Sequence, residues 1–307
     1  MSLFQRLNSI KARTPDQTRE TRQKNPVLLP DSLEISSNFG KCLLLEEARH
    51  GNICFPDHDI ASLLFDLKLI KGIGLITEAK LQDQGYTNIS DLHDHPRWGY
   101  HARHVENMIE NCHINELRLM GARDHALLSY FDPADLLFLD IETTGLWASQ
   151  PLFLIGLLYY KNEKIHINQF LARHYGEEKA VLSAANEVIQ DFKVVVSFNG
   201  KRFDLPYILG RSIEHRLFYS YPHHQVDLLH HARRRYRDSL PDCRLVTLEE
   251  HLLDFRRDGD IPGYLIPATY HRFAQKQEAG LIQPVLEHNK LDLLAMAKLL
   301  PSLVAPA

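Results

Sequence analysis

Two acidic residues separated by one position, Asp140 and Glu142, follow directly on the apolar run Leu136–Leu139. Because side chains alternate along a β-strand, both carboxylates would lie on one face at the end of a buried strand. Two buried like charges are costly unless a cation lies between them, and a divalent cation takes oxygen ligands readily. In the alternative interpretation, one acid pairs with a Lys or Arg and the other is solvated.

A third acid, Asp204, follows a second apolar run, Val194–Phe198, and a turn formed by Asn199 and Gly200. We expect a helix to begin at Asp204, because Pro206 is tolerated in a first helical turn. At such a position an Asp is either a metal ligand or the N-cap of the helix, and the local sequence fits both interpretations.

His288 and Asp292 lie in a predicted helix over residues 281–300. They are four residues apart, so they share one helix face, beside the apolar face that Leu291 and Leu294 supply. An Asp beside a buried face either pairs with a cation or binds a metal ion. For His288 the ordinary alternative is an exposed helix histidine, since the chain has 18 His.

The chain thus offers four carboxylates from strand ends and helices of one α/β domain, namely Asp140, Glu142, Asp204 and Asp292. Such a set matches a site for two Mg²⁺ or Mn²⁺ ions, which clamp the attacking and leaving oxygens of an in-line phosphoryl displacement. Mg²⁺ favours a few carboxylates together with water and substrate phosphate. The sequence therefore predicts metal-dependent chemistry on a phosphate ester.

Three segments carry a family resemblance: FLDIETTGL (138–146), FNGKRFDLPYI (198–208) and HNKLDLLAMAKLL (288–300). Together they resemble the DEDD 3′–5′ exonucleases of the ribonuclease-H-like superfamily, and the second also resembles the proofreading domains of family B DNA polymerases. With VDLLHHARRRY (226–236) and EHNKLDLLAMA (287–297), the chain is most similar to the YprB-type ribonuclease-H-like family. The resemblance covers about residues 130–302.

The resemblance implies a role for each matching residue. Asp140 would bridge both ions, Glu142 and Asp292 would hold one of them, and Asp204 would hold the second through water. The residues expected to contact the nucleic acid are Thr143, Thr144 and Leu146, which would shape the pocket for the terminal nucleotide, and Asn199 and Lys201, which would touch the strand.

His288 is the expected catalytic histidine, but its spacing departs from one pattern of the exonucleases. In one DEDD subclass a His lies five residues before the last Asp and acts as general base. In another subclass a Tyr lies four residues before it and orients the water. Here a His occupies the Tyr spacing. A His titrates near neutrality and could take the proton of the water directly, so both roles stay open.

Upstream of this domain, residues 69–77 (LIKGIGLIT) resemble a helix–hairpin–helix. There the glycines Gly72 and Gly74 would let backbone N–H groups and the next helix N-terminus approach a phosphate. An ordinary pair of antiparallel helices is the alternative. Residues 1–30, with six basic and two acidic residues, are expected to form a flexible basic tail.

Two further segments are ambiguous. Asp227 opens a predicted helix, 228–236, whose arginines either form a phosphate track or are merely solvated. We assign Asp227 no metal role ahead of the four acids. The segment Asp258–Gly263 lacks the spacing of an EF-hand loop, and we expect it to form a loop near the rim of the active site.

Composition sets the outer limits of function. With 307 residues, 44% hydrophobic, and a formal charge of −4, the chain is expected to be globular, and a basic nucleic-acid coat over the whole surface is excluded. The four Cys form no CxxC pair, which argues against a zinc ribbon. No apolar run reaches the roughly 20 residues of a membrane helix. We expect a reduced, soluble, cytoplasmic protein without membrane contact.

The predicted fold is α/β: a ribonuclease-H-like mixed sheet flanked by helices, over residues 129–307, preceded by a β-hairpin and helical nucleic-acid-binding region over 31–128. We place the hairpin in the runs 39–45 and 50–55. The predicted function is a Mg²⁺- or Mn²⁺-dependent 3′–5′ exonuclease that acts on single strands or ends of DNA or RNA. The alternatives are a non-catalytic nucleic-acid-binding module on a decayed nuclease fold and a ribonuclease-H-type endonuclease.

Overall fold

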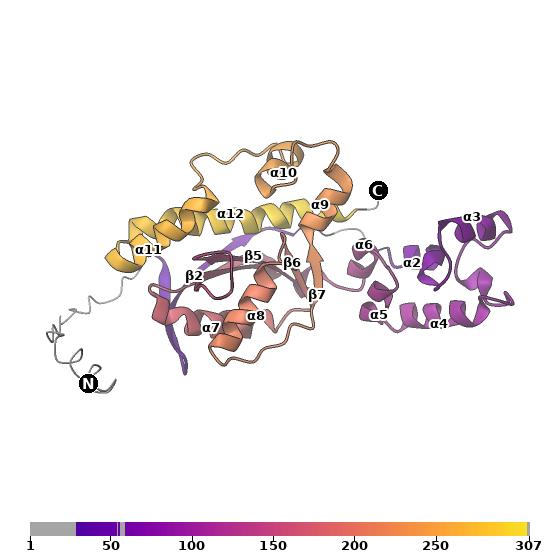
Figure 1. The fold of residues 1–307 in the computed structure, drawn as a ribbon, viewed down its shortest axis with the longest axis horizontal. Helices are drawn as coiled ribbons and strands as arrows, with labels where there is room; N and C mark the ends of the chain where they lie inside the picture. The colour runs from indigo at the N-terminus through magenta and orange to yellow at the C-terminus, as the bar shows by residue number, and fades with distance from the viewer. Residues whose placement is uncertain (1–28, 54, 56–58, 306–307) are drawn as a thin grey trace, which may run out of the picture.

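A seven-stranded sheet with helices on both faces forms the larger part of the molecule, and a group of short helices lies at one end of it (Figure 1). The structure is a computed structural model that describes residues 29–53, 55 and 59–305. Residues 1–28 of the predicted basic tail lie outside this range.

The strand order in the sheet is β1-β2-β5-β4-β3-β6-β7. Neighbours from β1 to β3 are antiparallel, whereas β3, β6 and β7 run parallel. The carboxyl ends of these three parallel strands therefore lie at the same edge of the sheet. The bounds are β1 Ser32–Ser37, β2 Gly40–His50, β3 Leu136–Thr143, β4 Leu152–Lys161, β5 Lys164–Leu171, β6 Val194–Ser197 and β7 His224–Asp227.

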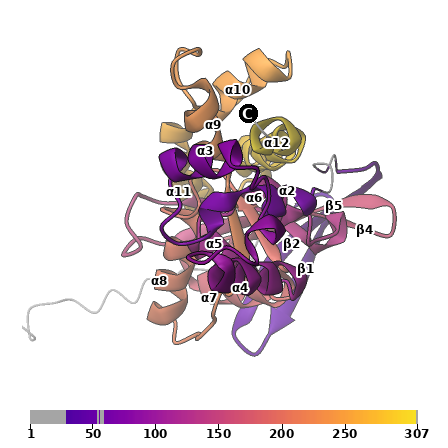
Figure 2. The same cartoon turned by 90° about the vertical axis from the view of Figure 1, so that its right-hand side faces the viewer.

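Helices cover the two faces unequally. The helices α7 (Glu178–Ile189) and α8 (Asp204–Glu214) lie on one side of the sheet, and the long α12 (Ala279–Val304) crosses the other side over β3 and β4 (Figures 1 and 2). Three more helices adjoin α12, namely α9 (Leu228–Tyr236), α10 (Leu245–Leu252) and α11 (Ile266–Lys276).

Alternation along β3 decides which side chains face α12. Leu136 and Phe138 pack in one core cluster with Leu293 and Leu300 of α12, and the odd-numbered positions pack in another cluster with α7. Asp140 and Glu142 continue the even-numbered series. Their carboxylates therefore lie on the side of the sheet that α12 covers.

The predicted hairpin is present, but its strands differ from those expected. β1 pairs with β2 around a turn at residues 38–39, and residues 40–50 form one continuous strand. β2 also pairs with β5 from Leu43 to His50. The hairpin, which we grouped with the helical region, is therefore an extension of the main sheet. Buried apolar side chains at Cys42 and Leu43 anchor it to the sheet core.

The helical segment at the end of the sheet has a hydrophobic core of its own, built around Leu67, Ile89, Leu92, Trp98 and Leu117. The helix that begins at Ala61 ends at Phe65, and a 3₁₀ turn follows it, with the Asp66 side chain accepting a hydrogen bond from the Lys68 amide. The α-helices are α2 Ala61–Phe65, α3 Leu75–Asp83, α4 Gly99–Glu110, α5 Ile114–Leu119 and α6 Asp124–Leu128. The short 3₁₀ helices of the chain are η1 Leu67–Leu69, η2 Ser90–Leu92, η3 Pro133–Asp135, η4 Tyr175–Glu177 and η5 Gly263–Leu265.

The predicted fold class, a mixed α/β sheet flanked by helices and preceded by a hairpin, is confirmed. Within the part of the chain that the structure describes, no helix combines the length and apolar character needed to cross a membrane.

Candidate active site

The carboxylate of Asp140 is held from the opposite helix. Asn289 of α12 is fully buried and donates a hydrogen bond from Nδ2 to Asp140 Oδ2 at 2.7 Å. Gln169 of β5 donates from Nε2 to Asn289 Oδ1 at 2.8 Å, which fixes the orientation of the Asn289 amide. Gly156, the partner of Asp140 in β4, leaves the space that Asn289 occupies, because a Cβ there would lie 2.1 Å from Asn289 Oδ1. Three strands and a helix thus position one acid.

Asp204 is the first residue of α8, and its side chain is only 4% exposed. The N-cap position belongs to Phe203 and makes no side-chain capping bond, so the N-cap interpretation of Asp204 is wrong. Burial raises the pKa of Asp204 to about 7, and the charges of Asp227 and Asp292 add to this against backbone hydrogen bonds that lower it. The carboxyl of Asp204 therefore faces the acid cluster.

The four acids lie close enough to affect one another. Burial, followed by the charge of Asp292, raises the pKa values of both Asp140 and Glu142 well above their ordinary values, and Asp204 raises both further. Among the described residues, no Lys or Arg forms an ion pair with Asp140, Glu142 or Asp204. Residues from β3, α8 and α12 are thus brought together with an excess of buried negative charge.

His288 lies one turn before Asp292 and is oriented by a fifth acid. Its Nδ1 lies 2.8 Å from Asp260 Oδ1, and its Nε2 lies 3.7 Å from Asp292 Oδ2. Asp260 belongs to the segment between α10 and α11 that we expected near the rim. Since Asp260 takes the Nδ1 side of the ring, the Nε2 atom is the one directed toward the acid cluster.

Arg257 lies next to Asp260 and Asp292. Its guanidinium contacts Glu249 of α10, Asp260 and Asp292, with Nη2 2.6 Å from Asp292 Oδ1. The side chain is 5% exposed. An arginine buried among three acids holds the α10–α11 segment against α12.

The loop after β3 stands at the opening of the site. Thr143 and Thr144 use their hydroxyls within this loop, donating to the carbonyl oxygens of Gly145 and Pro151 respectively. Leu146 and Trp147 are 78% and 76% exposed. The two threonines therefore shape the loop, while the side chains free to meet a ligand are the two large apolar ones.

Asn199 and Lys201 lie in the loop between β6 and α8, and Asp227 holds this loop in place. The buried Asp227 carboxylate accepts hydrogen bonds from the amides of Asn199 (2.8 Å) and Lys201 (3.2 Å), and also from Leu229 at the start of α9. Asn199 adopts a left-handed backbone conformation with φ of 67°. Asp227 thus positions the loop that leads to Asp204, and its charge is close enough to raise the pKa of Asp204.

Gly72 and Gly74 lie apart from these residues, in the helical segment. Gly72 has φ of +94° and lies against the ring of Trp98, so a side chain there would be strained. Gly74 is the N-cap of α3 and offers no side-chain capping bond. Leu75 and Ile76 follow it and are each 76% exposed. The helix–hairpin–helix interpretation stays a prediction.

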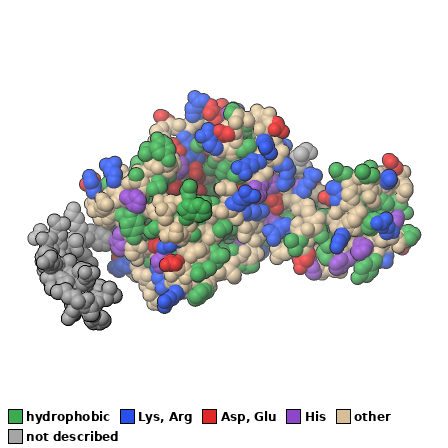
Figure 3. All heavy atoms as spheres, viewed as in Figure 1, with side chains coloured by type: hydrophobic (Ala, Val, Ile, Leu, Met, Phe, Trp, Pro, Cys, Tyr) green, Lys and Arg blue, Asp and Glu red, His purple; other side chains and the backbone are tan. Residues whose placement is uncertain are grey.

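The surface of the protein has a hollow lined by acidic side chains. In the face drawn in Figure 3, acidic side chains lie at the bottom of a hollow beneath the α10–α11 segment, with Lys, Arg and hydrophobic side chains around it.

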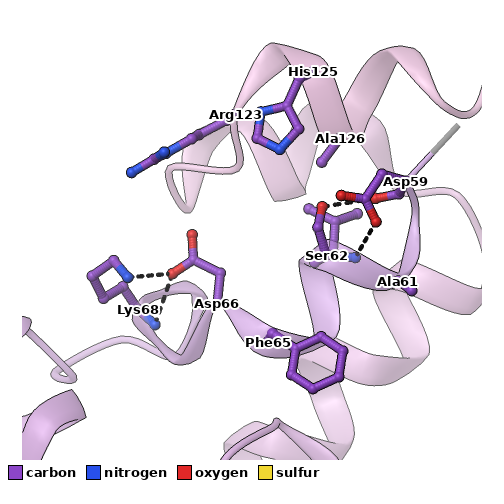
Figure 4. A pocket seen from close by; sticks show the side chains of 10 residues that line it. Asp59, Ala61, Ser62, Phe65, Asp66, Lys68, Arg123, His125 and Ala126 are labelled. Atoms are coloured by element: carbon purple, nitrogen blue, oxygen red, sulfur yellow. Dashed lines mark hydrogen bonds and ion pairs between the residues drawn. The ribbon is translucent and has the colours of Figure 1, made fainter. Parts of the chain in front are cut away.

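A separate cavity of about 440 Å³ lies in the helical segment between α2 and α6. Four of its polar side chains bond to one another, since Lys68 pairs with Asp66 and Ser62 bonds to Asp59 (Figure 4). The hollow with the acids is the better candidate for chemistry.

Whether these residues fit a divalent ion can be judged from their chemistry. As they stand, no three His, Cys, Asp or Glu side chains of the described residues are arranged to hold a metal ion. The donors nevertheless suit one: Asp140, Glu142 and Asp204 are oxygen ligands whose buried charge has no cationic partner. A divalent cation would offset that charge and find the carboxylates that Mg²⁺ and Mn²⁺ prefer.

Sequence patterns missed Asn289, Gln169 and Arg257 as parts of the site, and they placed Asp260 only in a loop near its rim. Asn289 lies between His288 and Asp292, where its polarity in an otherwise buried helix was a usable signal. Gln169 and Arg257 meet their partners only through the tertiary fold, so no local spacing could have marked them.

Comparison with known proteins agrees with the fold. The sequence model of the RNase_H superfamily matches residues 137–304, which is more than half of the chain. The chain therefore belongs to the ribonuclease H superfamily and has a nuclease-type fold.

Its similarity to individual proteins is more limited. It is 36% identical over 250 residues to the uncharacterized protein YprB of Bacillus subtilis (strain 168), covering 72% of this chain and 60% of YprB. The predicted YprB-type ribonuclease-H-like character is thus confirmed, although the chain spans less than two thirds of that relative. A family B DNA polymerase structure from Pyrobaculum calidifontis matches with a TM-score of 0.46 and 15% identity, over 56% of this chain and 25% of the polymerase.

Proposed function

We propose that this protein is a divalent-metal-dependent nuclease, a 3′–5′ exonuclease that hydrolyses phosphodiester bonds of DNA or RNA. The observation that carries the proposal is the gathering of Asp140, Glu142, Asp204 and Asp292 at one edge of the sheet, where burial and then their mutual charges raise the pKa values of Asp140 and Glu142. Such a cluster is unfavourable in an empty fold. Membership of the ribonuclease H superfamily supports the nuclease class.

The four acids would hold two Mg²⁺ or Mn²⁺ ions. Bound there, the ions would lower the pKa of a water molecule and neutralise charge on the attacking and leaving oxygens. The protein supplies the geometry: Asn289 keeps Asp140 Oδ2 in place, and the first residue of α8 supplies Asp204. Rigid support of this kind is what a site needs to hold reacting atoms in line.

His288 is proposed to act on the attacking water through Nε2. Asp260 accepts from Nδ1, which leaves Nε2 as the atom able to take or share the proton of the water. The distance of 3.7 Å from Nε2 to Asp292 places this atom beside the cluster. The choice between taking the proton and orienting the water can be tested by His288→Gln, since glutamine can orient a water molecule but cannot accept its proton.

The substrate would enter along the exposed loop after β3. Leu146 and Trp147 offer apolar surface against which a terminal base could stack. Thr143 and Thr144 would shape that pocket, and Asn199 and Lys201 would touch the strand next to it. In the helical segment, the turn at Gly72 and Gly74 would contact the phosphate backbone farther along the strand.

A cytoplasmic setting is part of the proposal. Among the described residues, Cys42, Cys112 and Cys243 are free thiols. Free thiols are usual in reducing compartments, where disulfides are rare.

The test is degradation of end-labelled single-stranded DNA and RNA by the purified chain with Mn²⁺, with Mg²⁺ and with chelator. We expect stepwise shortening from the 3′ end that chelator stops and that Asp140→Ala and Asp204→Ala abolish. Activity retained in both variants would overturn the proposal.

Two alternative functions give different results in the same assay. A circular substrate is cut only if the protein is an endonuclease. Binding that is unaffected by chelator, with no cleavage in either metal, would indicate a non-catalytic binding module.

A further inference from the structure

Arg257 makes three contacts, all with acids and all at the edge of the proposed metal site. Its Nε lies 2.8 Å from Glu249 Oε2, its Nη1 lies 2.9 Å from Asp260 Oδ2, and its Nη2 lies 2.6 Å from Asp292 Oδ1. The guanidinium is thus tethered to α10 on one side and reaches a proposed metal ligand on the other.

The three contacts are not equivalent. Those to Glu249 and Asp260 are directed hydrogen bonds. Nη2 is buried and makes no hydrogen bond of acceptable geometry, although Asp292 lies 2.6 Å away. Arg257 is therefore anchored by Glu249 and Asp260, and charge alone holds it against Asp292. The Asp292 side chain, which is 19% exposed, is thus tied to Arg257 by no directed hydrogen bond.

Arg257 is the only Lys or Arg among the described residues that forms an ion pair with any of the four proposed ligands. A guanidinium keeps its charge at all working pH values. In the absence of a divalent ion, Arg257 therefore offsets part of the repulsion within the acid cluster. When an ion binds to Asp292, the same fixed charge lies close to the ion and repels it.

We propose that Arg257 is a tethered countercharge that competes with the divalent ion for Asp292 and so sets the ion concentration at which the site fills. This inference rests on the proposed function, because it takes Asp292 as a ligand. It adds a positioning residue whose removal tightens ion binding while it weakens the empty fold.

The test measures Mn²⁺ binding directly, by the electron paramagnetic resonance signal of free Mn²⁺ during titration. Arg257→Met alone would leave Glu249 buried without its partner, so the variant used is Arg257→Met combined with Glu249→Gln. This double variant removes one positive and one negative charge, but only Arg257 of the two contacts Asp292, so the Mn²⁺ dissociation constant should fall, by up to about tenfold. The thermal unfolding midpoint of the metal-free variant should fall at the same time.

Two further variants separate charge from other effects. Arg256→Met removes a neighbouring arginine that is 80% exposed and pairs with Glu250, so its dissociation constant should match that of the wild type. Arg257→Lys keeps the charge and should also stay near the wild-type value. It serves as the deciding variant if the double variant does not fold: a tenfold tighter constant in Arg257→Lys would overturn the role of charge.

The outcomes distinguish this inference from the function on which it rests. A double variant that binds Mn²⁺ as weakly as the wild type, or more weakly, overturns the competition by Arg257 and leaves the metal site standing. A wild-type protein that binds no Mn²⁺ at all overturns both.

Discussion

The buried carboxylate of Asp204 lowers the stability of the folded protein. It is 4% exposed, and burial together with the charges of Asp227 and Asp292 raises its pKa. Buried like charges are retained where they serve a ligand, because the fold alone would be more stable without them. Repulsion within the acid cluster thus destabilises the metal-free protein, and a bound cation would reduce that repulsion.

Asp204→Asn should therefore stabilise the protein in the presence of chelator. The amide keeps the shape of the side chain and removes one charge, so we expect the free energy of unfolding at pH 7.5 to rise by about 1–3 kcal/mol. Urea denaturation measures this directly. In Mn²⁺ the variant should no longer be more stable than the wild type, because ion binding should raise the free energy of unfolding of the wild type alone.

The exposed Asp258, which lies outside the acid cluster, provides the control for that experiment. Asp258→Asn should leave the free energy of unfolding unchanged with and without Mn²⁺. If Asp204→Asn proves less stable than the wild type in chelator, the repulsion argued for the cluster does not exist.

Gly156 supports the site from a strand that carries no acid. A Cβ at this position would meet Asn289 Oδ1 at 2.1 Å and the other amide atoms at 2.7 Å. Gly156→Ala should push Asn289 off Asp140, lower the free energy of unfolding by about 1–3 kcal/mol and reduce nuclease activity. Urea denaturation and the oligonucleotide assay measure the two effects.

Gly280 is the matched control, since it lies in α12 and no atom lies within 4 Å of the position that an added Cβ would take. Gly280→Ala should raise stability by up to about 1 kcal/mol, because alanine favours helix over glycine, and should leave activity as it is. Equal losses in both variants would mean that Gly156 has no special relation to Asn289.

At the residue scale, the sequence could predict those members of the site whose spacing is local. Asp140 and Glu142 share a strand face, and His288 and Asp292 share a helix face. The periodicity of strands and helices therefore predicts that the two members of each pair lie close together. Arg257 meets Asp292 across 35 positions of chain. No periodic rule connects such positions, which is why the countercharge became visible only in the structure.

At the scale of elements, the parallel strands β3, β6 and β7 explain why the site lies where it does. Glu142, Asn199 and Asp227 come at or just after the carboxyl ends of these strands, which share one edge of the sheet. The apolar runs predicted these strands well. The hairpin was harder, because the partner of β2 is β5, more than one hundred residues later, and a local turn signal carries no information on that pairing.

The carboxylate of Asp124 is one of the contacts between the helical segment and the sheet. Asp124 of α6 lies 3.3 Å from His224 Nε2 of β7 and 2.8 Å from His231 Nε2 of α9. Burial raises the pKa of Asp124, but the close contacts with His224 and His231 outweigh it and hold the pKa well below the ordinary value of 3.8. The ionised carboxylate is therefore the form that joins the two parts.

Asp124→Asn tests this joint and its dependence on pH. Because the folded pKa is lowered, Asp124 contributes stability above pH 3.8, and this contribution is lost as the pH falls below 3.8 toward the folded pKa. At pH 7 we expect the variant to lose about 1–3 kcal/mol of unfolding free energy. The difference from the wild type should shrink when urea denaturation is repeated at pH 3.

The exposed Asp94 in the same helical segment serves as the control, and Asp94→Asn should match the wild type at both pH values. A loss in Asp124→Asn that is the same at pH 7 and pH 3 would show that packing, and not the charge of Asp124, makes the joint.

The whole molecule has separate hydrophobic cores in its two parts. The helical segment is organised around its own buried residues, and the sheet around the clusters that include β3 and α12. The boundary proposed from the sequence near residue 128 stays a prediction, and the hairpin at residues 32–50 pairs with β5 of the main sheet. A strand degraded at the acid cluster could be held at the same time by the helical segment.

Gly74→Asp tests whether both parts act on one strand. Gly74 is the N-cap of α3, its backbone is extended (φ −105°, ψ −178°), and no atom lies within 4 Å of an added Cβ, so an aspartate fits. The new carboxylate would cap the free N–H groups and repel phosphate, while the cap itself favours the helix. We expect KM for a single-stranded oligonucleotide to rise about fivefold with kcat unchanged and stability equal or higher. Gly74→Ala, which adds neither cap nor charge, should behave as the wild type. An unchanged KM in Gly74→Asp would show that the α3 N-terminus does not contact the substrate, and the helical segment would then need another role.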